Sequence, residues 1–159
     1  TIVAGDALDP VVVAQVVAGQ DVIINSLGST PNNPDDVCTR GTQNIISAMR
    51  RFDIRRLITV TALGVGDSYD QVPAFFKAII KTALRKAYAD KETQEAAIRA
   101  SDLDWIIVRP PGLTDGPLTG RYGVGTEARG NQVSRADVAH FVLQQVADDT
   151  YLRQAVALG

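Results

Sequence analysis

Short apolar runs alternate with longer amphipathic segments along this chain, and most of the runs end in glycine, proline or a small polar residue. The runs at 21–27, 56–62 and 104–109 carry apolar residues at consecutive positions, as expected for strands covered on both faces. Shorter runs at 1–4 and 156–158 predict two further strands. This alternation favours parallel strands joined by right-handed helical crossovers.

The segments between these runs carry helix signals. Asp9 is a typical N-cap, Pro10 suits the first helical turn, and Gly19 is a stop signal. Ser134 and Asp137 have the spacing of a capping box. The predicted helices start at Pro10 and otherwise cover roughly 36–51, 73–85, 88–100 and 135–147, while 114–133 is predicted to be a loop. We therefore expect one α/β domain over 1–159, a three-layer α/β/α, doubly wound parallel sheet.

Composition narrows the class of function. The chain has 159 residues, is 45% hydrophobic and 21% charged, and has a net charge of −2. It lacks the basic excess that binding a nucleic-acid backbone requires. One Cys and one His exclude a disulfide framework and a Cys/His zinc site. No apolar run approaches the ~18 residues of a membrane span, and no secretory signal opens the chain. We expect a cytoplasmic protein with no nucleic-acid, membrane or metal partner.

The ends of the predicted strands are the places to look for a ligand, because open parallel sheets bind ligands beyond the carboxyl ends of their strands. Unusual residues occur there: Gly5-Asp6, Leu27-Gly28-Ser29, Thr61-Ala62-Leu63-Gly64 and Pro110-Pro111-Gly112. The sequence therefore predicts a binding site along this edge of the sheet.

These segments also carry a resemblance to a known family. The matching residues are GDALDP at 5–10, VIINSLGS at 22–29, GTQNIISAM at 41–49, RRLITVTALGVGDS at 55–68, the segment at 87–122, and VSRADVAHFVL at 133–143. The chain resembles the atypical short-chain dehydrogenase/reductases, and within them the NmrA-like NAD(P)H-binding proteins and the flavin reductase/biliverdin reductase B proteins. The resemblance implies a Rossmann-like domain, NADP or NAD as cofactor with NADP slightly favoured, and a small-molecule substrate.

One feature of that family is not found in this sequence. Its members begin with a strand and a G-x-x-G-x-x-G turn, which lets a pyrophosphate approach a helix N-terminus. The resemblance starts at the family's third strand, so we expect about fifty residues, two strands and two helices, to be missing. In the family order these strands lie between 1–4 and 21–27. A complementing N-terminal segment or a homo-oligomer would cover the apolar edges otherwise exposed.

The resemblance assigns residues to the cofactor: Asp6, Ala7, Leu8, Leu27, Gly28, Thr59, Thr61, Leu63, Lys91, Pro110, Pro111, Gly112 and Leu113. Asp6 would meet the adenine, Gly28 would let the ribose and phosphates pass close to the backbone, and 110–113 would line the nicotinamide. Simpler roles remain open: Asp6 as a turn cap, Gly28 as a turn glycine, and the prolines as a strand exit.

Two of these residues, Thr61 and Lys91, are the catalytic candidates. The Thr61 hydroxyl is suited to a substrate carbonyl or a carboxamide, or Thr61 is simply a β-branched strand residue. Lys91 would bind the ribose hydroxyls; alternatively it pairs with Glu95 on a solvated helix face. The family's Tyr-x-x-x-Lys is here Tyr-x-x-Lys, which leaves Tyr88 on a neighbouring helix face as an alternative proton donor.

Arg121 and Tyr122 are the expected substrate residues, in a loop that would cover the acceptor, with Arg121 facing an acidic group. Three functions stay open. The first is an enzyme that passes hydride to a planar acceptor such as a flavin, a bilin or a quinone, for which orientation matters more than a side-chain acid. The second is an NmrA-like regulator or assembly factor that binds the dinucleotide. The third is a chain that binds nothing. A sugar-nucleotide epimerase is disfavoured, because it would keep the usual Tyr and a larger C-terminal substrate region.

Overall fold

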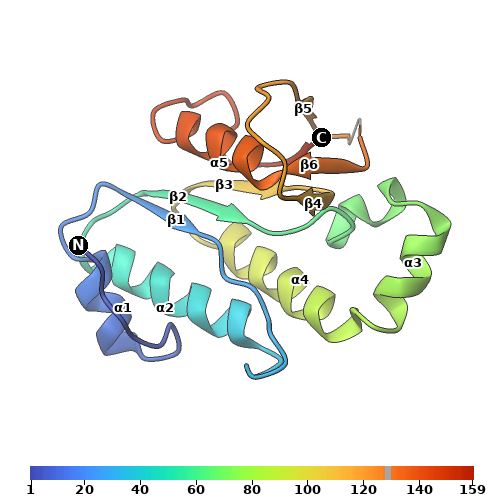
Figure 1. Cartoon of the computed structure of the whole chain (residues 1–159). Helices are drawn as coiled ribbons and strands as arrows, with labels where there is room; N and C mark the ends of the chain where they lie inside the picture. The colour runs from blue at the N-terminus through green and yellow to red at the C-terminus, as the bar shows by residue number, and fades with distance from the viewer. Residues whose placement is uncertain (128–129) are drawn as a thin grey trace.

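The computed structural model describes residues 1–127 and 130–159 and shows a mainly parallel sheet with helices on both faces (Figure 1). The strand order is β1-β2-β3-β7-β5. Strands β1 (Val22–Asn25), β2 (Arg56–Val60), β3 (Asp104–Arg109) and β7 (Gln154–Leu158) are parallel, and β5 (Val124–Gly125) is antiparallel to β7. The predicted α/β class and doubly wound Rossmann-like sheet are confirmed.

The strand predicted at 1–4 is wrong. Residues 1–4 form no strand, and Ile2 is 97% exposed. Among the described residues β1 forms an edge of the sheet and pairs only with β2. Residues 1–4 are exposed, so their backbone groups are left to water rather than to a neighbouring strand. An apolar run alone does not make a strand, because a strand needs a neighbour to pair with.

The helices cover the sheet unequally. Helices α1 (Pro10–Val17), α2 (Val37–Arg51) and α4 (Arg85–Arg99) lie on one face, and α5 (Arg135–Gln144) lies on the other (Figure 1). The 3-10 helix η1 (Gly66–Gln71) and helix α3 (Ala74–Lys81) follow β2. A second sheet pairs β4 (Gly112–Thr114) with β6 (Gln132–Ser134). The segment predicted as loop at 114–133 therefore holds β5 and the start of β6, which are too short to leave a period in the sequence.

The predicted helix caps are confirmed. The Asp9 carboxylate accepts a hydrogen bond from Val11 N at 2.8 Å, and Gly19 takes the left-handed conformation, φ +75°, just after α1. The Ser134 hydroxyl accepts from the Asp137 backbone N–H at 2.9 Å, and Ser134 donates to the Asp137 carboxylate at 2.8 Å. These local bonds fix where α1 and α5 begin and how they leave the sheet.

Two apolar layers hold the helices to the sheet. Leu57 and Ile58 are consecutive in β2 and both fully buried, because one faces each layer. The layer under α1, α2 and α4 contains Val13, Val17, Ile46, Ala48, Met49, Ile54, Leu57, Ile98, Leu103, Trp105 and Ile107. The layer under α5 contains Ile58, Ile106, Val108, Val133, Val138, Phe141, Val142, Val156 and Leu158.

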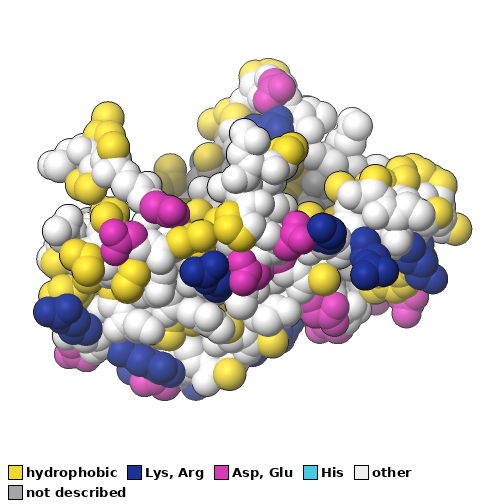
Figure 2. Space-filling view, turned by 90° about the horizontal axis from the view of Figure 1, so that it is seen from below, with side chains coloured by type: hydrophobic (Ala, Val, Ile, Leu, Met, Phe, Trp, Pro, Cys, Tyr) yellow, Lys and Arg dark blue, Asp and Glu magenta, His cyan; other side chains and the backbone are white. Residues whose placement is uncertain are grey.

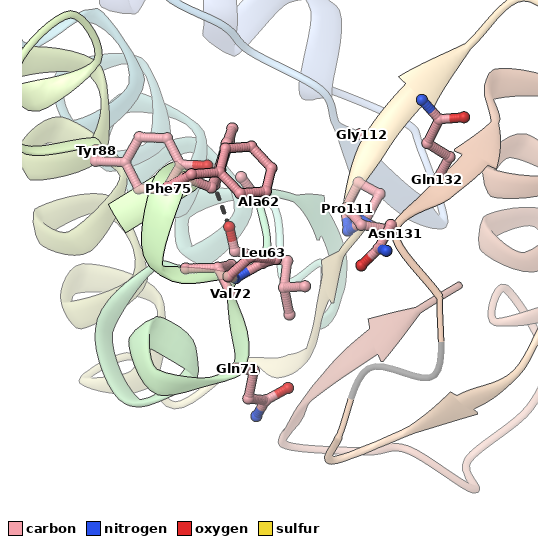
Figure 3. A pocket seen from close by; sticks show the side chains of 13 residues that line it. Ala62, Leu63, Gln71, Val72, Phe75, Tyr88, Pro111, Gly112, Asn131 and Gln132 are labelled. Atoms are coloured by element: carbon pink, nitrogen blue, oxygen red, sulfur yellow. Dashed lines mark hydrogen bonds between the residues drawn. The ribbon is translucent and has the colours of Figure 1, made fainter. Parts of the chain in front are cut away.

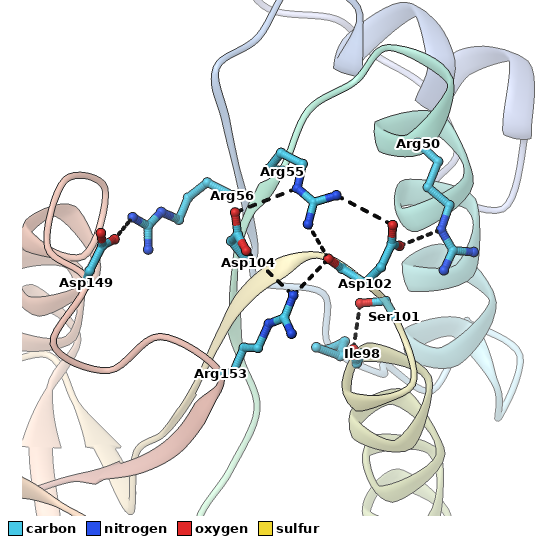
Figure 4. A network of polar contacts seen from close by, with 9 residues as sticks. All are labelled: Arg50, Arg55, Arg56, Ile98, Ser101, Asp102, Asp104, Asp149 and Arg153. Atoms are coloured by element: carbon cyan, nitrogen blue, oxygen red, sulfur yellow. Dashed lines mark hydrogen bonds and ion pairs between the residues drawn. The ribbon is translucent and has the colours of Figure 1, made fainter.

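Ion pairs tie the elements together at the amino ends of the strands, opposite the predicted site (Figure 4). The Asp102 carboxylate accepts from Arg50 Nε of α2 at 3.0 Å, and its backbone carbonyl accepts from Arg55 and Arg153. The hydrogen bond from Arg50 holds the pKa of Asp102 below its usual range. These side chains are largely exposed, so each pair adds little stability.

The face formed by α1, α2, α3 and α4 carries side chains of both charges. Lysine and arginine alternate with aspartate and glutamate across it, with apolar atoms between them (Figure 2). Over the ranges that the structure describes, no helix combines the length and apolarity needed to cross a membrane.

Candidate functional site

A pocket of about 530 Å³ opens beyond the carboxyl ends of β2 and β3 (Figure 3). Its lining residues are Ala62, Leu63, Gln71, Val72, Pro73, Phe75, Phe76, Tyr88, Pro110, Pro111, Gly112, Asn131 and Gln132. Small-molecule sites commonly measure ~300–1,000 Å³ and have mostly apolar walls. In Figure 3 one wall comes from the segments that follow β2 and the other from the 111–112 and 131–132 segments.

Four of the predicted cofactor residues line this pocket: Leu63, Pro110, Pro111 and Gly112. The prolines have no backbone N–H, so β3 ends at Arg109 and the chain leaves the sheet. Two backbone hydrogen bonds hold the exit in place: Leu63 N donates to Pro110 O at 2.9 Å, and Gly112 N donates to Asn131 O at 3.1 Å.

Several lining residues were missed from the sequence. They are Gln71 at the end of η1, Val72 and Pro73 after it, Phe75 and Phe76 in α3, and Asn131 and Gln132 at β6. The adjacent pair Phe75 and Phe76 is the one sequence signal for this wall, because two neighbouring residues of a helix cannot both face the core. In the structure Phe75 is the one that is exposed, at 70%. The other residues reach the pocket through long-range folding that leaves no local pattern.

Tyr88 of α4 also lines the pocket. Its hydroxyl donates to the Leu63 carbonyl at 3.1 Å, and burial raises its pKa. The hydrogen of the Tyr88 phenol is therefore held by the backbone of Leu63, on the same side of the pocket (Figure 3).

Lys91 lies one turn further along α4, at the end of β1. Its Nζ donates to the Leu27 carbonyl at 3.4 Å. Burial lowers the pKa of Lys91, although Cys38, Asp90 and Glu95 act in the opposite direction. The solvated pair with Glu95 considered above is not what the structure shows, because Glu95 is buried and pairs with Arg109. Burial raises the pKa of the neighbouring Cys38 thiol to about 11.

The Asp6–Leu8 turn lies beside Leu27. The Asp6 carboxylate accepts from Leu8 N at 2.9 Å, so the simple role of Asp6 as a turn cap is present. A Cβ at Gly41 of α2 would lie 2.5 Å from a Leu27 methyl and 3.5 Å from the Ala7 Cβ. Glycine at 41 therefore allows Leu27 and the turn to approach the same spot on α2. Apart from its two chain neighbours, no atom of the described residues lies within 4 Å of a Cβ built at Gly28, so that backbone is open to a ligand.

These contacts link the predicted residues into one edge. Ala7 and Leu27 meet at Gly41, the Leu27 carbonyl accepts from Lys91, and α4 carries both Lys91 and Tyr88. Tyr88 then bonds Leu63, which bonds Pro110. The structure thus brings the turn at Asp6 and the pocket into one series of contacts along the carboxyl ends of the strands.

Thr59 and Thr61 are buried below this edge. Thr61 Oγ1 donates to the Glu95 carboxylate at 2.7 Å. A hydroxyl has one hydrogen to donate and can also accept, so Thr61 can accept from a ligand but has no hydrogen left for a substrate carbonyl. Thr59 Oγ1 is buried, with no hydrogen-bond partner in the part of the chain that the structure describes.

Leu113, Arg121 and Tyr122 lie outside the pocket lining and outside the series of contacts that joins the Asp6 turn to the pocket. The Tyr122 hydroxyl is 2.6 Å from His140 Nδ1 on α5, and its ring packs against Phe141. Leu113 and Arg121 are exposed.

The loop before Arg121 is held by α5. The Asp137 carboxylate accepts from the Thr119 and Gly120 backbone N–H groups at 2.9 and 2.8 Å, and from the hydroxyls of Thr119 and Ser134. Burial alone would raise the pKa of Asp137, but these hydrogen bonds outweigh it and lower the pKa to about 2. Within 1–127 and 130–159 no group of three His, Cys, Asp or Glu side chains is arranged to hold a metal.

Curated relatives align with most of this chain. A protein of Schizosaccharomyces pombe named UPF0659 protein C216.03 is 30% identical over 149 residues, covering 86% of this chain and 60% of the relative. The uncharacterized sugar epimerase YhfK of Bacillus subtilis is 30% identical over 138 residues, covering 84% of this chain and 60% of the relative. The chain thus spans about three fifths of the length of these relatives.

Solved structures share the fold. ChuY of Escherichia coli O157:H7, described as an anaerobillin reductase, has a TM-score of 0.80 and 31% identity, covering 97% of this chain and 72% of that one. A short-chain dehydrogenase/reductase of Veillonella parvula in complex with NADP has a TM-score of 0.81 and 23% identity, covering 100% of this chain and 71% of that one. A family model described as NAD(P)H-binding matches residues 1–149. The chain belongs to this NAD(P)H-binding family.

Proposed function

We propose that this protein is an NAD(P)H-dependent reductase that passes hydride to a planar acceptor in the pocket beyond β2 and β3. The observation that carries the proposal is the continuous edge from the Asp6–Leu8 turn through Leu27 and Lys91 to the pocket at Leu63 and Pro110. An elongated dinucleotide needs such an edge, with the pocket at its reactive end.

The residues present fit two parts of the cofactor. Lys91 uses one of its three hydrogens on Leu27 O, at a long 3.4 Å, which leaves hydrogens for ribose hydroxyls. The open backbone at Gly28 and the Asp6 turn suit the passage towards the adenine. Since residues 1–159 contain no G-x-x-G-x-x-G turn, we assign none of them to the pyrophosphate. NADP is slightly favoured over NAD, in line with the NADP complex of the Veillonella parvula neighbour.

The cofactor supplies a hydride when it is bound. The chain's own contribution is to orient the reactants and exclude water. Leu63, Pro110 and Pro111 form apolar walls near the strand ends, and Phe75, Phe76 and Tyr88 offer aromatic surface to a flat ring. A conjugated acceptor takes its proton from solvent, so the Tyr88 hydroxyl can stay on Leu63 O throughout.

An NmrA-like regulator that binds the cofactor without turnover is the second candidate. The observation in its favour is Thr61, whose only hydroxyl hydrogen is held by Glu95. A reductase that needed Thr61 to polarise a substrate carbonyl would be impaired by this arrangement. A conjugated acceptor does not need that contact, which is why we place the reductase first.

Turnover separates the two candidates. Purified protein is mixed with NADPH or NADH and, in parallel, riboflavin, a water-soluble quinone or biliverdin, and the loss of NAD(P)H absorbance is followed against a protein-free control. We expect protein-dependent oxidation with at least one acceptor, reduced in Lys91→Met. Saturable NADPH binding with no oxidation by any acceptor would instead support the regulator.

A further inference from the structure

A buried ion pair lies below the pocket without lining it. Glu95 of α4 and Arg109, the last residue of β3, are 3% and 4% exposed, and neither is among the lining residues. Arg109 Nε and Nη2 donate to the two Glu95 carboxylate oxygens at 3.0 and 2.5 Å, a bidentate pairing with fixed geometry. Glu95 and Arg109 can therefore act on a ligand in this pocket only through the residues that they hold in place.

The pair holds both walls of the pocket. Thr61, which donates to Glu95 at 2.7 Å, directly precedes Ala62 and Leu63 of one wall. Arg109 directly precedes Pro110 of the other wall. Two backbone hydrogen bonds also join these segments, from Thr61 N to Val108 O at 2.8 Å and from Leu63 N to Pro110 O at 2.9 Å. Proline has no N–H to donate, so Pro110 and Pro111 donate no backbone bonds of their own, and the side-chain bonds to the Glu95 carboxylate hold the two walls alongside the remaining ones.

Arg109 also reaches a third segment. Its Nη1 lies 2.6 Å from the carboxylate of Asp67, in the first turn of η1, and the residues that follow η1 line the pocket. A Cβ at Gly66 would be 3.6 Å from Arg109 Nη2, and Gly66 has φ +53°, so the backbone passes close to the guanidinium. Burial would lower the pKa of Arg109, but the contacts with Glu95 and Asp67 outweigh it and raise the pKa.

Stability alone does not account for such a pair. Removing two charges from water costs about as much as their attraction returns, and apolar replacements of a buried pair are often as stable. A bidentate pair does, however, fix the distance and orientation of its two side chains within a narrow range. Because the pair lies where two pocket-forming strands end, it also restricts how far apart the two pocket walls can lie.

We propose that Glu95 is a positioning residue that sets the spacing of the pocket walls. It acts through Thr61, which directly follows β2, and through Arg109, which ends β3 and contacts Asp67 of η1. The part of this proposal that concerns the reaction rests on the proposed reductase function. The expected consequence is that loss of the Glu95 charge loosens residues 61–73 and 110–112 together, although Glu95 itself never touches a ligand.

Amide hydrogen exchange tests whether Glu95 holds the pocket walls, and it does not depend on enzymatic activity. We expect Glu95→Gln to speed exchange in 61–72 and at Gly112 by about tenfold, while α5 stays as in the wild type; Pro73, Pro110 and Pro111 have no amide hydrogen to follow. The matched control is Glu92→Gln, on the same helix, where Glu92 is exposed. Equal exchange in Glu95→Gln, Glu92→Gln and wild type would overturn the proposal.

A second variant keeps the test decisive if Glu95→Gln does not fold. Asp67→Asn weakens the links from η1 to Arg109 and to Arg99 of α4, which lies 3.8 Å from the Asp67 carboxylate, and leaves the Glu95–Arg109 pair in place. The Asp67 side chain is 72% exposed, so we expect the variant to fold. We then expect faster exchange in 66–72 alone, and unchanged exchange there would overturn the proposal.

Steady-state kinetics test the role in the reaction. Glu95→Gln should raise the KM for the acceptor about tenfold, whereas a smaller folded fraction would lower kcat and leave KM unchanged. An unchanged KM in the folded variant would overturn the positioning role. If the wild type oxidises no NADPH with any acceptor, the proposed reductase function is wrong. Hydrogen exchange then still decides whether Glu95 holds the two pocket walls.

Discussion

Tyr88 shows at the scale of a single residue how position decides a role. It lies in the pocket wall, close to where a catalytic tyrosine would be sought, yet its hydrogen is held by the Leu63 carbonyl at 3.1 Å and burial raises its pKa. Our account gives its ring a packing role and its hydroxyl no part in proton transfer.

Replacement of the hydroxyl tests this. We expect Tyr88→Phe to keep kcat for a conjugated acceptor within about threefold of the wild type, because a general acid contributes ~10²–10⁴-fold and this residue is not one. Tyr88→Ala, which also removes the ring, should raise the acceptor KM. A hundredfold fall in kcat for Tyr88→Phe would show that the phenol donates a proton.

Asp137 gives a pH-dependent prediction. Its pKa falls from the usual 3.8 to about 2 in the folded protein, so its hydrogen bonds stabilise the fold above 3.8 and are lost as the pH falls towards 2. The melting temperature of Asp137→Asn should therefore lie below that of the wild type above pH 3.8, with a gap that closes near pH 2. The exposed Asp115 provides the control, Asp115→Asn. A gap that does not change with pH would contradict this assignment.

Residue roles were predictable where they are local. The caps of Asp9 and Ser134 follow from sequence because their partners lie two and three residues away. From the sequence, a solvated pair between Glu95 and Lys91 stays open as an alternative, because the actual partner of Glu95, Arg109, is brought to it only by the fold. An arginine at the end of a strictly apolar strand was the available signal, since a buried guanidinium requires an acidic partner.

Helix α2 is capped by a residue of another element. Asp36, its local N-cap residue, makes no side-chain cap bond. Instead the buried carboxylate of Asp90, on α4, accepts from the backbone N–H groups of Cys38 and Thr39 at 2.8 and 2.9 Å. This contact also fixes α4, and with it Lys91 and Tyr88, against α2.

We expect Asp90 to stabilise the start of α2 more than Asp36 does. Asp90→Ala should lower the free energy of unfolding by about 2 kcal/mol, because it leaves two buried N–H groups unpaired, while Asp36→Ala should change it by less than about 0.5 kcal/mol. Urea denaturation of both variants measures the difference. Equal losses would contradict the capping role of Asp90.

Element positions were predictable to the extent that they are periodic. The runs at 21–27, 56–62 and 104–109 hold β1, β2 and β3, as consecutive apolar residues predict. Cover on both faces is found in the inner strands β2 and β3, whereas Ile24 of the edge strand β1 is exposed. The apolar run at 1–4 has no strand neighbour, and the pocket wall at 131–132 comes from a strand too short to be recognised. The strand ends of the site could be foreseen, but the η1 and α3 wall could not.

At the scale of the whole molecule, the β1 edge of the sheet has no neighbouring strand among the described residues. Ile24 within β1 is 44% exposed, near a chain start in which Ile2 and Val3 are also exposed. Such an edge is a template for pairing. We expect sedimentation velocity to show concentration-dependent self-association, weakened in Ile24→Lys. A single monomeric species of 17.0 kDa at every concentration would contradict this expectation.

The central claim is that the edge from the Asp6 turn to the pocket binds NAD(P)H, and titration of NADPH followed by cofactor fluorescence tests it most directly. We expect saturable binding that weakens about tenfold in Lys91→Met, through loss of a charge-assisted hydrogen bond. Lys86→Met is the control, because Lys86 lies on the same helix in an exposed pair with Asp35. No saturable binding by the wild type, or equal affinity in Lys91→Met and Lys86→Met, would contradict the account.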